Sequence, residues 1–313
     1  MSKTSRKKAR ERQRARRAAR AVAVREQPAK PAPRAATAAV AGPPRKVARG
    51  PVETAPAARS AVDSLSSFLS RLGFTRVVAI ARRDFAGMFV SPVGWVVAAV
   101  FVFLVSGFGF IATVLAGQQA TMAGVFGVIT NFLMVVVIPL LTMRVLAEER
   151  AQGTLELLLT SPVRDWEVTA GKWIAVFAFY VLLLATTLVY VVILRIYAAG
   201  LDLGLIGATY LGLVLVGGAA IAIGVLASSL TRNQIVAFFV AMALLLVTWY
   251  AGYVIGFFVA PPANVLFEYA GGWNRFQAFS LGQAALRDVV YFVTLTFGAL
   301  FLTTRVLASR RWR

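Results

Sequence analysis

The acidic side chains that could bind a partner or act on a substrate are concentrated in one stretch, residues 144–172. It holds five carboxylates and four Lys or Arg, whereas 59 uncharged residues precede it and 22 follow it. Such a surface suits electrostatic contact with a basic or polar protein. An ordinary hydrophilic loop with Leu side chains resting on lipid is the alternative, but it does not require five acids near an anionic membrane. The acids are Glu148, Glu149, Glu156, Asp165 and Glu167.

The chain lacks the residues that most catalytic and metal sites need. It contains no Cys and no His, which excludes disulfides, thiolate chemistry, and catalysis or metal ligation by His. An ATP-binding P-loop requires the spacing GxxxxGK[ST]. Trp173 follows the pair Gly171-Lys172, and Trp166 stands where the first glycine should be. We therefore expect no enzymatic activity, no metal and no cofactor in this chain.

Long uncharged intervals indicate a membrane protein. The chain is 59% hydrophobic, and a helix needs about 20 apolar residues to cross a hydrocarbon core of about 30 Å. The intervals predict an all-α membrane protein with six transmembrane helices. The last interval has only 16 residues and needs Arg305 to reach the interface. The predicted spans are 93–115, 122–142, 173–194, 205–228, 234–259 and 289–304.

The distribution of Lys and Arg predicts the orientation of these spans. Six spans place both termini on one side of the membrane. Beyond residue 60, the segments on that side carry 13 Lys or Arg, and those on the opposite side carry three. The positive-inside rule therefore places both termini and residues 144–172 in the cytoplasm, in a multi-pass protein of the cytoplasmic membrane.

Residues 1–60 are a basic tail rich in Ala, Pro and Arg. The tail has 17 Lys or Arg, three acids and seven Pro. We expect it to be disordered, because it cannot bury enough apolar surface to offset its chain entropy. It is either a solvated extension, an arm that binds anionic membrane lipid or an arm that binds nucleic acid. Binding to nucleic acid is disfavoured, because no aromatic residue interleaves the Arg runs.

The rest of the chain divides into two parts. Residues 61–92 are predicted to form an amphipathic interfacial helix, and residues 93–313 are predicted to form the six-helix domain.

The region 144–172 predicts an elbow made of a helix, a short helix and a helix. The second span, kinked at Pro139, leaves the membrane and stops at Gly153, because Gly readily adopts the left-handed conformation that ends helices. Thr154 then caps the short helix. Pro162 begins the helix that leads into the third span, with Asp165 in its first turn, where the helix dipole favours an anion.

The short helix of the elbow has one apolar face. Leu155, Leu158 and Leu159 share that face at helical spacing, and Glu156 points away from it. The elbow therefore presents Leu side chains next to carboxylates immediately below the membrane.

The residues of this elbow resemble a known family. MRVLAEERAQGTLELLLTSPVRDWEVTAGKW is similar to the loop between the second and third spans of ABC-2 type transporter permeases, and most similar to the gliding-motility and nitrous-oxide-accessory subgroup. LRDVVYFVTLTFGALFLTTRVLASRRWR is similar to the C-terminal end of that family, and the likeness covers about residues 75–313. The positions that match the elbow pattern are Glu148, Glu149, Gly153, Thr154, Glu156, Pro162 and Lys172.

The resemblance implies a six-helix membrane subunit that works as a dimer, with itself or with a related permease. It also implies a pair of ABC ATP-binding subunits that bind and hydrolyse the ATP. The short helix is then the coupling helix that docks in a cleft of the ATPase. The implied ATPase-coupling residues are Glu148, Glu149, Gly153, Thr154, Leu155, Glu156, Leu158 and Leu159.

The connection 260–288 is long and rich in aromatic residues. Gly271-Gly272 divides it, and we expect a re-entrant or interfacial helix over 274–286. This helix is either a gate on the outer side or a plain anchor in the interface, and the sequence does not separate the two. The candidate gate residues are Trp273, Phe276 and Phe279.

The chain is therefore predicted to be the permease subunit of an ABC transporter, an exporter driven by ATP hydrolysed in a separate subunit. The alternative is a non-transporting scaffold or a channel-like subunit. An intramembrane protease is disfavoured because the predicted spans contain no Asp, and their lack of charge favours an apolar or amphipathic cargo over an ion. Small residues that could let helices approach closely, within or between subunits, are Gly212, Gly217, Gly218 and Gly224.

Overall fold

The computed structural model of the chain describes residues 73–117, 121–154, 163–197, 201–258 and 271–309. All of these belong to one compact unit, Ala55–Arg313. The described residues form helices and short connections without any strand, in agreement with the predicted all-α class. The basic tail 1–60 and the first part of the predicted interfacial helix lie outside the described residues. The predicted short helix of the elbow, around Thr154–Leu159, lies outside them from residue 155 on, as does Pro162.

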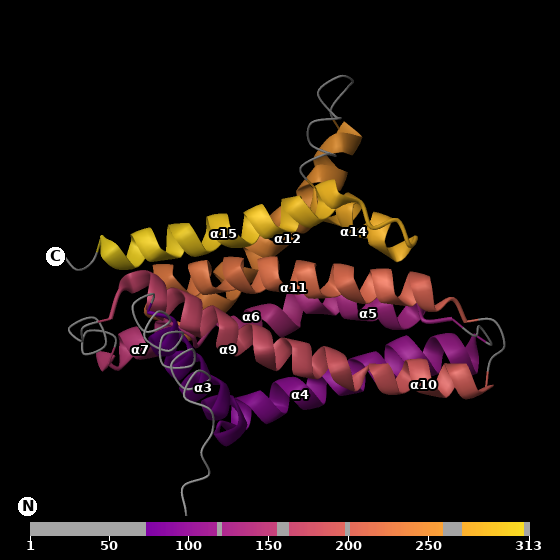
Figure 1. Cartoon of the computed structure of the whole chain (residues 1–313), viewed down its shortest axis with the longest axis horizontal. Coiled ribbons are helices and arrows are strands. Elements are labelled where there is room, and N and C mark those ends of the chain that lie inside the picture. Colours follow the sequence, from indigo (N-terminus) through magenta and orange to yellow (C-terminus); the bar gives the residue numbers. More distant parts are fainter. Residues whose placement is uncertain (1–72, 118–120, 155–162, 198–200, 259–270, 310–313) are drawn as a thin grey trace, which may run out of the picture. The chain divides into compact units, whose positions relative to one another are not determined.

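The described helices follow one another with few breaks (Figure 1). Two of the segments, η1 and η2, are π-helical stretches that continue an α-helix. In chain order the helices are α3 (Phe74–Val90), α4 (Pro92–Leu104), η1 (Val105–Ala116), α5 (Ala123–Phe132), η2 (Leu133–Val137), α6 (Ile138–Thr142), α7 (Ala147–Ala151), α9 (Asp165–Thr186), α10 (Leu188–Tyr197), α11 (Leu203–Leu230), α12 (Gln234–Phe258), α14 (Gly272–Ser280) and α15 (Leu286–Ala308).

Five of these continuous helical stretches are long and apolar enough to cross a membrane. Within α12, which lies where the fifth span is predicted, the apolar run Gln234–Tyr250 is shorter than that. The multi-pass membrane class is therefore confirmed, and the count of six stays a prediction. The five stretches are Pro92–Ala116, Ala123–Ala151, Asp165–Tyr197, Leu203–Leu230 and Leu286–Ala308.

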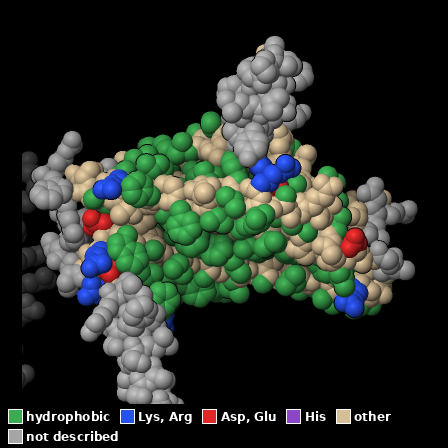
Figure 2. All heavy atoms as spheres, turned by 45° about the horizontal axis from the view of Figure 1, so that its top comes forward, with side chains coloured by type: hydrophobic (Ala, Val, Ile, Leu, Met, Phe, Trp, Pro, Cys, Tyr) green, Lys and Arg blue, Asp and Glu red, His purple; other side chains and the backbone are tan. Residues whose placement is uncertain are grey.

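The outer surface of the helices is apolar, as a lipid environment requires. Figure 2 shows a broad hydrophobic surface with few charged side chains. Large side chains such as Phe103, Ile196 and Phe297 are 67%, 70% and 68% exposed, respectively. In water, such a continuous apolar surface would drive aggregation, whereas in a bilayer it faces acyl chains.

Helix α11 is central to the packing, because it contacts α6, α7, α9, α12, α14 and α15 (Figure 1). Its glycines make close approach possible: a Cβ on Gly217 would overlap the ring of Tyr180, whose hydroxyl donates a hydrogen bond to the carbonyl oxygen of Leu213 at 2.8 Å. These glycines therefore serve contacts within the subunit. The same holds for Gly212 against Phe279 and for Gly224 against Thr142.

The first span begins as predicted. Ser91 is extended and separates α3 from α4, its hydroxyl accepts a hydrogen bond from the amide of Val93 at 3.4 Å, and Pro92 occupies the first helical position. Proline loses nothing there, because the first amides of a helix have no partner within the helix. The interfacial helix and the first span are thus two separate helices.

The irregularity predicted at Pro139 takes the form of a π-helical turn. The segment Leu133–Val137 immediately precedes the helix that contains Pro139. Proline has no amide hydrogen, and its ring crowds the carbonyl of the residue four positions earlier, Val135, which lies inside that segment. The wider π-turn accommodates this crowding within a continuous span.

The predicted limits of the third and the last span differ from those of their helices. The helix that leads into the third span begins at Asp165 rather than at Pro162, because the Glu167 carboxylate accepts the Arg164 amide hydrogen at 2.9 Å and fixes the helix start there. The acidic first turn predicted for this helix is confirmed. The last span is 23 residues long, because its helix also includes exposed Arg287 and buried Asp288, whose carboxylate is paired with Arg275.

Candidate functional site

The helix of the second span is interrupted by a turn where it leaves the bundle, and a serine on another helix binds the backbone of that turn. Helix α6 ends at Thr142, and a turn leads to α7. The hydroxyl of Ser228 accepts hydrogen bonds from the amides of Leu146 at 3.1 Å and Ala147 at 3.0 Å, and it donates to the carbonyl of Met143 at 3.2 Å. Ser228 is fully buried, so it satisfies backbone groups that water does not reach.

An arginine fixes the start of the elbow to the same end of α11. The Arg150 guanidinium donates hydrogen bonds to the carbonyl oxygens of Ser229 at 2.7 Å and Thr231 at 3.1 Å. These carbonyls lie at the C-terminus of α11, where helical partners are lacking and a cation is favourable. Helix α7 is therefore attached to α11 through both its backbone and a side chain.

The first helix of the elbow ends as the sequence predicts. Gly153 has a φ of 73°, the left-handed conformation that ends helices. The hydroxyl of Thr154 donates to the carbonyl oxygen of Glu149 at 3.3 Å. Thr154 thus helps to end α7, and its predicted role as cap of the following short helix involves residues outside the described part.

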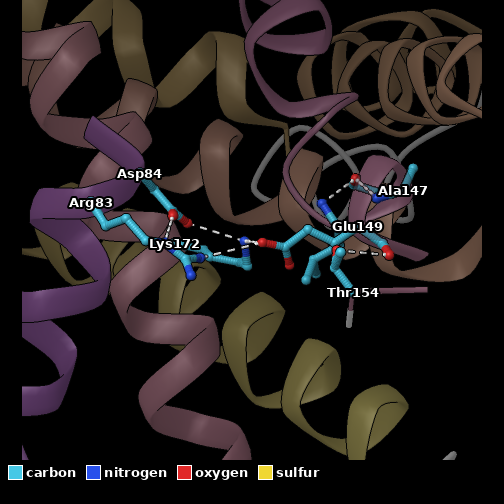
Figure 3. A network of polar contacts seen from close by, with 8 residues as sticks. Arg83, Asp84, Ala147, Glu149, Thr154 and Lys172 are labelled. Carbon is cyan, nitrogen blue, oxygen red and sulfur yellow. Dashed lines mark hydrogen bonds and ion pairs between the residues drawn. The ribbon is translucent and has the colours of Figure 1, made fainter. Parts of the chain in front are cut away.

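A buried lysine joins three helices at the base of the elbow (Figure 3). The Lys172 ammonium on α9 lies 2.8 Å from Oε1 of Glu149 on α7 and 3.1 Å from Oδ2 of Asp84 on α3. Arg83 contacts the same two carboxylates, at 2.9 Å for Asp84 and 3.4 Å for Glu149. Two cations and two anions therefore form one neutral cluster, which we call the elbow cluster.

Because Lys172 is buried, its ammonium needs the carboxylates of the elbow cluster for the fold to be stable. Its side chain is only 3% exposed. An unpaired charge at that position would cost more than about 3 kcal/mol of desolvation. Partial burial alone would lower the pKa of the Arg83 guanidinium, but the hydrogen bond to Asp84 and the charges of Asp84 and Glu149 raise it overall. The two carboxylates therefore stabilise the charged form of Arg83.

Helix α3 is clamped along α9. A Cβ on Gly171 would stand 2.9 Å from the side chain of Ile80, so the two backbones approach closely. Near the start of α3, Arg76 pairs with the buried carboxylate of Glu167 at 3.6 Å. The predicted interfacial helix α3 is therefore attached to α9, the helix after residues 155–162.

The predicted coupling residues fall into two groups. Glu148, Glu149, Gly153 and Thr154 lie together on and after α7. Their neighbours in the predicted short helix lie outside the described residues. Glu149 faces inward to the elbow cluster, whereas the sequence alone placed it as a contact for the ATPase. The positions outside the described residues are Leu155, Glu156, Leu158, Leu159 and Pro162.

Sequence reasoning missed Ser228, Asp84 and the role of Arg83. One signal for Asp84 was available, because it is an acid beside two arginines at the edge of a 59-residue uncharged interval, and such an acid needs a partner. A comparable signal for Ser228 did not exist. Its function depends on a turn of the chain 82 residues away from it.

Comparison with known protein families now identifies the chain. The family described as ABC-2 family transporter protein matches residues 78–310, which is most of the chain and includes every helix of the elbow cluster. The chain belongs to the ABC-2 transporter family. A search of curated proteins finds no match. As an ABC-2 permease, the protein is a membrane subunit of an ABC transporter, a class that associates with ATP-binding subunits and carries no ATPase motif of its own.

The far end of the ABC-2 permease contains the aromatic helix of the predicted gate. Helix α14 ends at Ser280 rather than at 286, because Gly282 adopts a φ of 78° and the amide of Gln283 donates back to the carbonyl oxygen of Ala278 at 2.8 Å. Residues 259–270 of this connection lie outside the described residues.

The three candidate gate residues of α14 have different surroundings. Phe279 is fully buried and Phe276 is 5% exposed, both against Gly212 of α11. Trp273 is partly buried and stacks on Tyr250 with ring centroids 6.0 Å apart. The permease thus packs two of these rings into its core, and Trp273 alone remains near the surface.

A buried ion pair ties α14 to the last span of the permease. The Arg275 guanidinium donates to Oδ1 of Asp288 at 2.6 Å, and both side chains are at least nine-tenths buried. Asp288 occupies the first turn of α15, where the helix dipole favours an anion. Among the described residues, the permease contains no group of three carboxylates that could hold a metal ion.

Proposed function

We propose that this permease is the membrane subunit of an ABC exporter of the gliding-motility and nitrous-oxide-accessory type. In this proposal, two permease subunits, identical or related, rest on a pair of ATP-binding subunits. The elbow faces the cytoplasm together with both termini. The cargo is apolar or amphipathic, because the predicted spans carry no charge that could serve as an ion relay.

The elbow cluster is the observation that carries the proposal. A docking surface transmits movement only if it is attached to the helices that must move. Lys172 attaches α7 to α9 and α3, and Ser228 attaches the same segment to α11. Movement of the 155–162 segment by an ATPase would therefore be passed to three membrane-associated helices at once. This rigid attachment supports transport over a passive scaffold.

The test is site-specific crosslinking in a complex of the permease with its ATP-binding subunit. A photoreactive residue at Thr154, beside the predicted coupling helix, is expected to capture the ATP-binding subunit. The same residue at Gln283, at the far end beyond α14, is the matched control and should capture none of it. Capture at both positions or at neither would reject the docking assignment.

A substitution on the predicted Leu face tests the same proposal by function. Leu158→Asp should abolish assembly with the ATPase, because burying a carboxylate in place of a packed Leu costs at least the roughly 2–5 kcal/mol of a lost core side chain. Gln152→Asp, on an exposed neighbour of α7, should assemble normally. Normal ATP-driven transport by the inserted Leu158→Asp variant would favour the scaffold or channel alternative.

A further inference from the structure

A cavity of about 460 Å³ lies directly beside the elbow cluster. Its walls come from α3, the start of α4, the end of α6, the turn before α7, α7 itself and α9. This volume lies within the range of roughly 300–1,000 Å³ that is typical of small-molecule sites. Of the predicted ATPase-coupling residues, Glu148 and Glu149 line this cavity, so the cavity adjoins the predicted docking surface.

The cavity has a charged end and an apolar end. The charged end has three cations and three anions and is neutral overall, and the apolar end is lined by side chains of α4, α6 and α9. A ligand that fits both ends is an amphiphile whose head group carries both signs of charge. The charged residues are Arg83, Asp84, Arg144, Glu148, Glu149 and Lys172.

Two polar atoms at the charged end are not satisfied within the protein. Oε2 of Glu149 and Nε of Arg144 are buried and have no hydrogen-bond partner among the described residues. Among the described residues, Nε of Arg144 has a long ion pair of 3.8 Å with Glu148. Buried polar groups of this kind normally find a partner, and an ammonium donor beside Glu149 and a phosphate acceptor beside Arg144 would satisfy both atoms.

The level of the cavity in the membrane favours a bilayer lipid as the amphiphile. Ser91 and Gly94, at the corner between α3 and α4, line it. At the same corner, Trp95 is 63% exposed and donates its indole hydrogen to the carbonyl oxygen of Phe89 at 2.8 Å. An exposed Trp with a polar partner is typical of the membrane–water interface, where lipid head groups lie.

We infer that this cavity binds the head group of a zwitterionic phospholipid with a primary ammonium, phosphatidylethanolamine. Its phosphate lies at Arg144 and its ammonium at Glu148 and Glu149. A trimethylammonium head group fits poorly, because none of the described lining residues is aromatic and could form a cation–π cage. An anionic lipid without an amine offers no ammonium to Oε2 of Glu149, and it adds a net negative charge to an end that is neutral overall. The bound lipid braces the elbow, because it joins the turn before α7 to α7 itself.

The test is native mass spectrometry of the full chain, delipidated and then mixed with phosphatidylethanolamine, phosphatidylcholine and phosphatidylglycerol of different acyl masses. Phosphatidylethanolamine should be retained on the order of tenfold over either competitor, the effect of about one charge-assisted hydrogen bond. No selectivity, or a preference for phosphatidylglycerol, overturns the proposal. A retained compound that is not a bilayer phospholipid identifies the cavity as a cargo site and overturns it as well.

A cavity-filling variant shows whether the selected lipid occupies this cavity. Gly87 lines it, and a Cβ there meets nothing within 4 Å, so the first carbon of Gly87→Leu has room and the rest of the side chain occupies the cavity. It should lose the selectivity and retain a normal melting temperature. Gly298→Leu is the matched control, because its position on α15 is equally open and remote from the cavity, and it should retain the selectivity. Equal selectivity in both variants would reject the site.

A crosslinking measurement covers the case in which Gly87→Leu does not fold. A photoreactive residue in place of Met88, which lines the cavity, should capture phosphatidylethanolamine from vesicles that contain it with phosphatidylglycerol in equal amounts. The same residue at Val78, exposed on α3 and outside the cavity lining, should capture both lipids in proportion to their abundance. Proportional capture at Met88 contradicts the proposal.

Discussion

The ammonium of Lys172 lies 2.8 Å from the carboxylate of Glu149, and this contact connects the two helices on either side of the elbow. The predicted coupling helix, around Thr154–Leu159, lies in the segment between them. The elbow is therefore closed at its base by an ion pair. A force applied to its tip acts on the membrane helices through that pair and through the backbone.

Removal of the Lys172 charge should destabilise the protein strongly. Lys172→Met leaves the partly buried carboxylates of Asp84 and Glu149 with Arg83 in place of two cations, at a cost of about 1.5–3 kcal/mol, the value of a hydrogen bond to a charged group. The expected result is a lower melting temperature in detergent. Arg82→Met is the control, because Arg82 is exposed on the same helix α3 and should be neutral within about 0.5 kcal/mol.

A double substitution separates the ion pair from other effects of the same change. Lys172→Met combined with Glu149→Gln should be more stable than the sum of the single changes predicts. In the double variant the side chain at position 149 is neutral, so the loss of Lys172 no longer leaves a charge at that position without its partner. Additive losses would show that Lys172 acts through packing alone.

The two neighbouring serines of α11 should differ sharply in their effect on stability. Ser228→Ala leaves the amides of Leu146 and Ala147 without an acceptor, at a cost of about 1–3 kcal/mol. Ser229→Ala removes only a bond to the carbonyl of Leu226 on its own helix and should be nearly neutral. Thermal melts of both purified variants measure the difference, and equal melting temperatures would refute the proposed role of Ser228.

Two glycines of α11 should also respond differently to the same change. Gly217→Ala places a methyl group in the ring of Tyr180 and should cost about 1–3 kcal/mol through overpacking. Gly207→Ala, on the same helix, meets nothing within 4 Å and should be neutral or stabilising. Melting temperatures measure both, and a tolerated Gly217→Ala would show that Tyr180 packs elsewhere.

The orientation of the spans can be tested with single cysteines, since the chain has none of its own. A cysteine at exposed Gln152 should react with an impermeant thiol reagent only after the membrane is opened. One at exposed Gln283 should react in intact cells. The reverse pattern would invert the predicted topology.

Several features of this protein followed from the sequence because they depend on local rules. An apolar run of membrane length becomes a helix in a bilayer wherever its neighbours lie, since its backbone groups must bond within the segment. Helix ends follow local rules as well. Pro92 marks the start of α4 because the first helical amides need no partner, and Gly153 marks the end of α7 through its left-handed backbone. The membrane class, most of the spans and the end of α7 were therefore predictable from the sequence.

The roles of individual charges were decided only by the tertiary structure. Asp84, Glu149 and Lys172 are separated by more than twenty residues in each pair, and no periodicity relates them. The low dielectric constant around a buried ammonium makes its partners obligatory but does not specify which carboxylates they are. Helix packing makes that choice, because α3 lies against α9 at Gly171 and α7 lies against α11 at Ser228.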